Sequence, residues 1–162
     1  MDSTSILINI RKILRSVNLE SKRIQKEYGI SIPQLLTLNF LKTCEDFKAT
    51  HGQISSYLNL NSSTVTGIIS RLEKKGYVAK LPNLKDKRVT YVALTTSGSN
   101  LLTKTPQLMH EQLTSKLDKL SEGQLKEIER AFKLLIEVMG IDDLKAYPLV
   151  TLDEIPPVTD QK

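Results

Sequence analysis

Several residue types are scarce in this chain, and each scarcity excludes a class of protein. A single cysteine, Cys44, leaves no partner for an intramolecular disulfide, which fits a reducing cytoplasm. With only two histidines beside it, a metal site of the usual histidine and cysteine kind is not expected. No run approaches the roughly 18 consecutive apolar residues of a membrane helix, and no signal peptide is visible. We therefore expect a cytoplasmic protein with no cofactor and no membrane partner.

Acidic residues are scarce in the middle of the chain. Residues 48–91 carry eight basic and two acidic side chains, a net charge of +6. Residues 1–47 have a net charge of +2, and residues 92–162 have a net charge of −3. Such a concentration of positive charge is typical of a protein that binds a polyanion. The alternative is a solvated basic surface, which charge alone does not exclude.

Apolar spacing and capping signals predict a mainly α protein with a small β-hairpin wing (α+β). An amphipathic helix is expected first, followed by a second helix with Ser31 and Gln34 at capping-box spacing. A short third helix is expected over about 53–58. The fourth helix begins near Ser62, with Asn61 or Ser62 as its cap, and stops at Gly76.

Two short β-type runs follow the fourth helix. They cover residues 77–81 and 89–94, and residues 82–87 between them are rich in turn formers and lysine. Because two strands alone do not form a stable sheet, the hairpin is expected to pack on the helices. Helices followed at once by a hairpin describe a winged helix-turn-helix, here over about 32–98.

The C-terminal part is predicted to be helical again. Thr95 can cap a long helix that Pro106 should kink or restart. Ser121 and Gln124 form another capping-box pair, and one apolar stripe follows on the last helix, made of Leu125, Ile128, Phe132, Leu135 and Met139. Prolines and scattered acids predict an extended tail over 141–162.

The fourth helix has two faces of opposite character. Val65, Ile68, Ile69 and Leu72 converge on the side expected to face the core. The opposite side collects small, uncharged or basic residues with no acid among them, and we identify the candidate DNA-binding residues of this helix as Ser62, Ser63, Thr64, Thr66, Gly67, Ser70 and Arg71. Small side chains let a helix approach base edges, and hydroxyls bond to bases and phosphates. The alternative is an ordinary surface helix, where Glu and Lys would be expected instead.

The tip of the hairpin concentrates charge. Its candidate DNA-binding residues are Lys85, Asp86, Lys87 and Arg88. An arginine on such a wing can enter the narrow, electronegative minor groove, and Asp86 could orient the Arg88 guanidinium across the turn. A solvated turn that only keeps the edge soluble is the alternative.

Four segments, in order and at matching spacing, resemble the MarR family of bacterial regulators. They are 63–66 (STVT), 72–78 (LEKKGYV), 86–88 (DKR) and 94–98 (LTTSG). The resemblance implies a single domain over 1–140 that forms a homodimer through helices at about 5–28 and 98–140. It further implies a repressor that binds a pseudo-palindromic double-stranded DNA operator. Many members of the family are released by a small aromatic effector held between the dimerisation helices and the winged helix.

Within that resemblance, Ser63, Thr64 and Thr66 contact DNA and Asp86 with Arg88 forms the wing element. Ser70 and Arg71 come from the helical pattern alone. Gly67 departs from the family, because many members carry a larger polar side chain there. The tail after residue 140 is also longer than the family needs.

Other functions have less support. Cys44 is expected to be a buried small side chain and not a redox sensor, and His51 and His110 to be surface or helix-end residues. No nucleophile motif predicts an enzyme. A winged-helix protein-interaction module would lack the basic wing, and an RNA-binding protein would expose aromatics for stacking. The central aromatics Tyr57, Tyr77 and Tyr91 fall instead at core-like positions.

Overall fold

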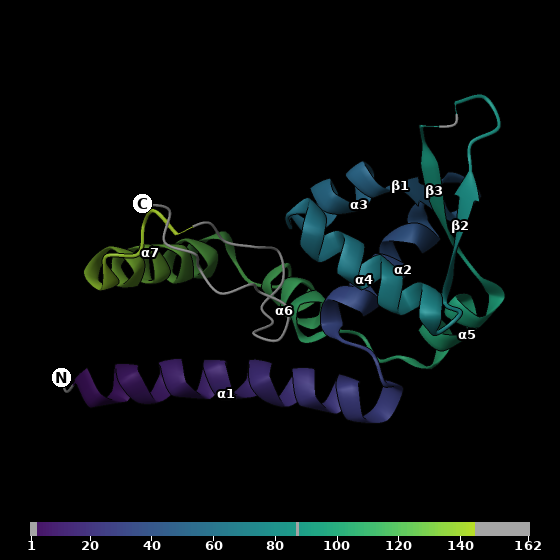
Figure 1. Ribbon diagram of the computed structural model, residues 1–162. Coiled ribbons are helices and arrows are strands. Elements are labelled where there is room, and N and C mark those ends of the chain that lie inside the picture. The colour runs from purple at the N-terminus through teal and green to yellow at the C-terminus, as the bar shows by residue number, and fades with distance from the viewer. Residues whose placement is uncertain (1–2, 87, 145–162) are drawn as a thin grey trace. The chain divides into compact units, whose positions relative to one another are not determined.

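The computed structural model describes residues 3–86 and 88–144 (Figure 1). These residues form two compact units, the first ending at Thr105 and the second beginning at Pro106. The first unit contains five helices, one 3₁₀ turn and three strands, and the second contains two helices among its described residues. The mainly helical fold with a small sheet agrees with the sequence-based prediction.

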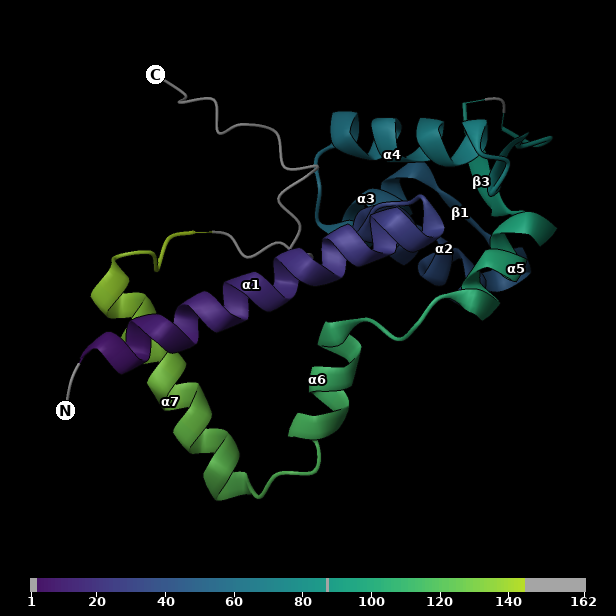
Figure 2. The same cartoon turned by 90° about the horizontal axis from the view of Figure 1, so that it is seen from below.

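The first unit begins with a long helix. Helix α1 runs without interruption over Ser3–Tyr28 and ends at Gly29, whose φ of +67° favours glycine (Figure 2). Helix α2 (Ile32–Thr43) then begins with the predicted capping box. The Ser31 hydroxyl accepts the Gln34 amide, and the Gln34 side chain accepts the Ser31 amide.

The helix-turn-helix follows a short connection. A 3₁₀ turn (Glu45–Phe47) leads to helix α3 (His51–Leu58), which starts two residues before the predicted start because Thr50 and Gln53 form a second capping box. Asn59 ends α3 in the left-handed conformation. Helix α4 (Ser62–Lys74) is capped by Asn61, one of the two residues predicted for that role.

The sheet has one strand more than expected. Strands β2 (Val78–Pro82) and β3 (Thr90–Leu94) form the predicted hairpin, and β1 (Lys48–Thr50) pairs with the other edge of β3. All pairs are antiparallel, in the order β1-β3-β2, with Ala49 opposite Val92. Strand β1 was not predicted, because three residues are too few to show the alternation of a strand. The third strand stabilises a hairpin that would be marginal alone.

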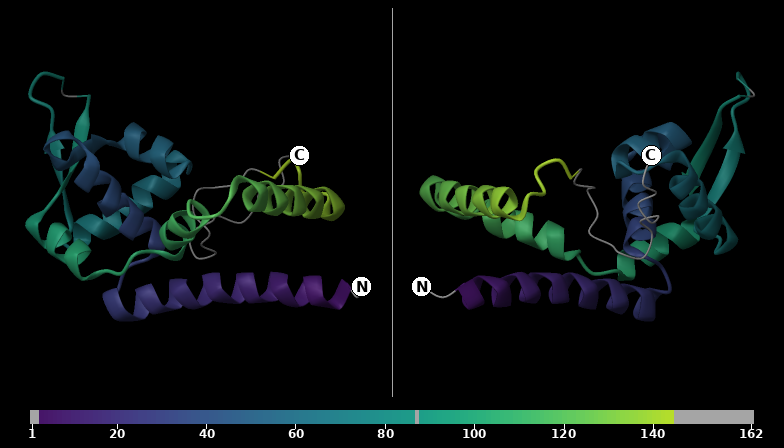
Figure 3. Two further views of the ribbon diagram at one scale, coloured as in Figure 1. Left: turned by 180° about the vertical axis from the view of Figure 1, so that it is seen from behind. Right: turned by 60° about the vertical axis from the view of Figure 1, so that its left-hand side comes forward.

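Helices α2, α3 and α4 and the sheet enclose one apolar core. Its fully buried side chains include Leu35, Leu38, Leu41, Ile54, Leu58, Val65, Ile68 and Leu72. Beyond this core the hairpin projects past the helices of its unit (Figure 3). The core therefore fixes α4 and the base of the hairpin, and leaves the far end of the hairpin exposed.

Helix α5 (Thr96–Lys104) closes the first unit and is capped by Thr95, as predicted. In the second unit, α6 (Met109–Leu117) and α7 (Glu122–Met139) follow Pro106, which separates α5 from α6 as expected. Ser121 and Gln124 form the predicted capping box of α7. The apolar stripe on α7 is exposed in the single chain, with Phe132 at 51% and Met139 at 53%.

One prediction about the core is wrong. Tyr57 is 45% exposed and does not lie inside the protein. Its ring stacks on Phe40, with ring centroids 4.3 Å apart. The pattern of α3 alone could not reveal this, because the stacking partner comes from α2.

Candidate nucleic-acid interface

Helix α4 presents its polar side to solvent because its apolar side is fully used in the core. Val65, Ile68 and Leu72 have no exposed surface, and Ile69 is 2% exposed. Ser62, Ser63, Thr66 and Arg71 are exposed, while Thr64, Gly67 and Ser70 are half-buried. The sequence-predicted residues of α4 therefore share one accessible surface.

The hydroxyl groups of α4 are of two kinds: some donate a hydrogen bond within the protein, and others have no partner among the described residues. The Asn61 side-chain oxygen accepts the Thr64 amide at 2.8 Å and the Ser63 hydroxyl at 2.9 Å. The donor of Ser63 is thus used within the cap. The hydroxyls of Ser62, Thr64 and Ser70 have no hydrogen-bond partner among the described residues. These three can donate to an acceptor outside the protein.

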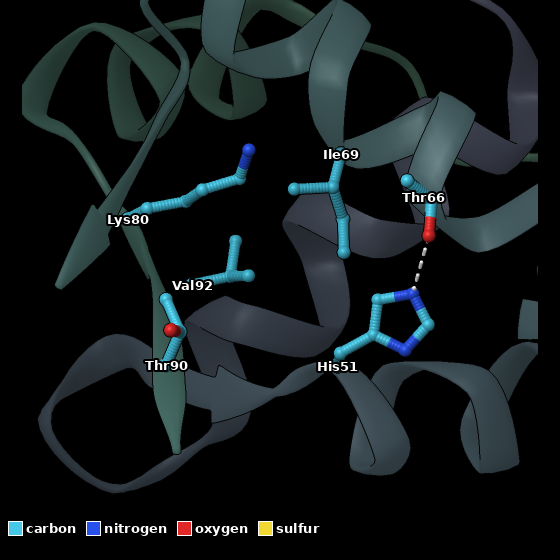
Figure 4. Close-up of a pocket in the computed structure, with 6 residues that line it drawn as sticks. All are labelled: His51, Thr66, Ile69, Lys80, Thr90 and Val92. Atoms are coloured by element: carbon cyan, nitrogen blue, oxygen red, sulfur yellow. Dashed lines mark hydrogen bonds between the residues drawn. The ribbon is translucent and has the colours of Figure 1, made fainter. Parts of the chain in front are cut away.

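The Thr66 hydroxyl also donates within the protein, and it is held by two contacts. Its hydroxyl donates to the Ser62 carbonyl at 2.9 Å and lies 3.0 Å from His51 Nε2. His51 is the first residue of α3 and is half-buried. Figure 4 shows the imidazole reaching across to the Thr66 hydroxyl. His51 was predicted only to be a surface or helix-end residue, because no motif links it to Thr66, fifteen positions away.

The absence of a side chain at Gly67 has a local consequence. A β-carbon added there would lie 3.8 Å from both terminal guanidinium nitrogens of Arg71. The Arg71 guanidinium thus lies beside the Gly67 backbone, one turn earlier on α4. A branched or long side chain at residue 67 would occupy that space.

Two side-chain turns order the tip of the hairpin. The Asn83 side-chain oxygen accepts the amides of Lys85 at 2.9 Å and Asp86 at 3.4 Å. The Asp86 carboxylate accepts the Arg88 main-chain amide at 2.9 Å. Asp86 thus orders the backbone at Arg88, where the sequence analysis expected it to orient the guanidinium. Lys85 and Arg88 are exposed, whereas the predicted residue Lys87 lies outside the described residues.

A pocket of about 190 Å³ opens between α4 and the strands (Figure 4). His51, Thr66, Lys80 and Thr90 contribute polar groups to its wall, and Ile69 and Val92 contribute apolar ones. Lys80 also forms an ion pair of 2.8 Å with Glu73, the only acid of α4. Lys80 was not predicted as a site residue, because it is the only charged residue of an otherwise apolar strand.

Lys48 on β1 adds to the basic character of the sheet edge. Its ammonium lies 3.0 Å from the Asp46 carboxylate and 5.4 Å from the centre of the Tyr91 ring. The hydrogen bond to Asp46 raises the pKa of Lys48 above its ordinary value, because it stabilises the charged form. Asp46 offsets that charge locally.

Cys44 lies at the end of α2 and is half-buried. Burial raises the pKa of the thiol above its ordinary value, which lowers the fraction of reactive thiolate. Among the described residues, no cluster of three or more His, Cys, Asp or Glu side chains could hold a metal ion. Within the same residues, no helix is long and apolar enough to cross a membrane.

Comparison with known proteins gives one consistent picture. The family model described as transcriptional regulator SarA/Rot matches residues 20–105. The multiple antibiotic resistance protein MarR of Escherichia coli is 29% identical over 144 residues, covering 84% of this chain and 99% of MarR. The transcriptional repressor IacR of Pseudomonas putida is 25% identical over 114 residues, covering 70% of this chain and 67% of IacR.

Two solved structures share the fold. The MarR family regulator Sco3205 of Streptomyces coelicolor, crystallised with DNA, has a TM-score of 0.62 at 20% identity, covering 83% of this chain and 87% of Sco3205. The MepR–DNA complex of S. aureus has a TM-score of 0.63 at 21% identity, covering 85% of this chain and 99% of MepR. At these identities the likeness establishes the fold.

Proposed function

The chain belongs to the SarA/Rot family of transcriptional regulators and has the MarR-type winged helix-turn-helix fold, and from this premise we propose that it binds double-stranded DNA sequence-specifically. In this proposal α4 enters the major groove and the β2–β3 wing lies at the adjacent minor groove. The observation that carries it is the accessible surface of α4. That surface combines hydroxyls, a glycine and cations, and its one acid, Glu73, is paired with Lys80.

These residues can contact both the bases and the phosphate backbone of a DNA duplex. The hydroxyls of Ser62, Thr64 and Ser70, which have no partner among the described residues, can donate to base or phosphate acceptors. The amides at the start of α4 can bind a phosphate. Arg88 stands at the exposed end of an ordered turn, where a guanidinium can enter a narrow minor groove. Lys85 and Lys87 add phosphate contacts in the same segment.

The regulator acts as a homodimer on a pseudo-palindromic operator and represses transcription. The exposed apolar residues of α1 and α7 support a second copy as their partner, because large apolar areas are rarely left in water. A small aromatic effector would lower DNA affinity by favouring a dimer with the wrong spacing of its two winged helices. Repression and effector release rest on the family alone.

A winged-helix module that binds another protein is the second class considered. It would present an apolar surface at α4, whereas the described surface there consists of hydroxyl, glycine and basic residues and one paired acid, Glu73. The composition of this surface therefore favours DNA binding over binding to another protein.

The test is selection of duplexes from a random pool, followed by affinity measurements over a salt series. We expect a selected pseudo-palindrome, a steep loss of affinity with salt, and about tenfold weaker binding by Arg88→Ala. Lys104→Ala is the matched control, because this exposed cation ends α5, at the end of the sheet opposite the wing tip (Figure 1). Weak binding with no selected sequence would favour the protein-interaction module.

A further inference from the structure

The Thr66 hydroxyl cannot donate a hydrogen bond to DNA while its two bonds within the protein are kept. The Ser62 carbonyl carries no hydrogen, so the 2.9 Å bond between them uses the only proton of the Thr66 hydroxyl. The 3.0 Å contact with His51 must then be a bond that the ring Nε2–H donates to the Thr66 oxygen. The hydroxyl therefore has no proton left for a phosphate or for a base acceptor.

The same two bonds fix the rest of the side chain. Threonine carries a hydroxyl, a methyl group and a hydrogen on its β-carbon, so holding the hydroxyl also holds the methyl group in one rotamer. The Ser62 bond alone is a common feature of threonine in helices. His51 adds a second tie from another helix, and the side chain is exposed. An exposed threonine is thus held with its methyl group as the part that has no bond.

We propose that Thr66 recognises a thymine through an apolar contact between its methyl group and the 5-methyl group of the base, and that His51 is the positioning residue that holds Thr66 for this contact. Thymine is the only base with a methyl group in the major groove. The inference rests on the proposed function, because it requires α4 to lie in that groove. It assigns His51 a part in specificity that its sequence position did not indicate.

The test replaces each thymine of the selected operator, one at a time, by deoxyuridine, which lacks only the methyl group. We expect one position in each half-site where this change weakens wild-type binding about fourfold, the effect of one methyl contact. Thr66→Ser should weaken binding to the thymine operator by a similar factor and lose its sensitivity to uracil there. Thr66→Val should keep that sensitivity although it lacks both hydrogen bonds, because valine keeps a methyl group and in a helix is confined to one strongly preferred rotamer.

Variants of His51 test the positioning role. His51→Ala should reduce the penalty for uracil at the same position, whereas His51→Gln, whose side-chain amide can donate a hydrogen bond, should retain it. Thermal unfolding of each variant serves as the control: a variant as stable as the wild type changes recognition and not folding.

The outcomes separate this inference from the function on which it rests. A selected operator that tolerates uracil at every position, or a Thr66→Ser variant with full uracil sensitivity, overturns the thymine contact and leaves the DNA-binding function in place. An equal uracil penalty in His51→Ala and wild type overturns the role of His51. A failure to select any sequence overturns both proposals.

Discussion

Gly98 is required for a steric reason: the main chain of Tyr77 lies too close to residue 98 to leave room for a side chain. A β-carbon added at Gly98 would lie 2.3 Å from the Tyr77 carbonyl oxygen and 2.8 Å from Leu94 Cδ1. The first of these is main chain, so it cannot swing aside. The start of α5 packs against the start of β2 only because residue 98 has no side chain.

We therefore expect Gly98→Ala to lower the free energy of unfolding by about 1–3 kcal/mol, the usual cost of overpacking. Chemical denaturation followed by circular dichroism measures it. Gly123→Ala is the control, because its β-carbon would meet only the Ser121 hydroxyl at 4.0 Å. That variant should be neutral or gain up to about 1 kcal/mol from helix propensity. Equal stability of the two variants would contradict the close approach at Gly98.

At the scale of single residues, the sequence indicated which side chains of α4 reach the surface better than which of them can still donate a hydrogen bond. The hydroxyls of α4 were predicted to contact DNA, and the structure places them on one accessible surface. Which hydroxyls still have a proton to donate depends on Asn61, Ser62 and His51. These bonds depend on side-chain rotamers and, for His51, on a neighbouring helix, so no pattern within α4 could reveal them.

The wing is an element whose shape depends on an acid. Asp86 carries a negative charge next to three cations, so electrostatics alone predicts that removing it tightens binding to DNA. Its carboxylate, however, accepts the Arg88 main-chain amide at 2.9 Å and so orders the backbone from which Arg88 projects. The two effects have opposite signs.

Two substitutions at Asp86 separate the effect of its charge from the effect of its hydrogen bond to Arg88. Asp86→Asn keeps an oxygen that can accept the amide and removes the charge, so affinity for the selected operator should stay equal or rise. Asp86→Ala removes both, and we expect weaker binding by about threefold to tenfold, because Arg88 must be ordered on binding. Fluorescence anisotropy measures both affinities. Tighter binding by Asp86→Ala would mean that the charge of Asp86 outweighs the turn.

Elements with strong end signals were predicted closely. Asn61, Thr95 and the capping pairs at 31–34 and 121–124 all occupy the expected cap positions, since a cap depends only on residues a few positions apart. Strand β1 was missed because its existence depends on β3, more than forty residues later in the chain.

At the scale of the whole molecule, the single chain leaves much apolar surface exposed. On α1, Ile13 and Leu14 are 50% and 57% exposed, and on α7 Leu134 and Val138 are 58% and 77% exposed. Each helix is stable enough to form, but its apolar side lacks a complete cover in one chain. This is the surface expected of a subunit in a homodimer.

We expect Phe132→Asp, which places a charge in the apolar stripe of α7, to shift the protein from dimer to monomer and to weaken operator binding at least tenfold. Sedimentation velocity measures the first effect and anisotropy the second. Lys133→Asp is the control, because Lys133 lies on the polar side of the same helix, one turn from both Glu129 and Glu137. A Phe132→Asp protein that remains dimeric would place the interface elsewhere.

The sequence by itself determined the class of fold, the order of the helices and hairpin, the caps, and the likeness to MarR-type regulators. These properties follow from periodicity, end signals and motifs, all of which involve residues near one another in the chain. Only the tertiary structure decided the third strand, the exposure of Tyr57, the close approach at Gly98 and the bond between His51 and Thr66. Each of these depends on a contact between segments far apart in the sequence, and such contacts exist only after the core has packed.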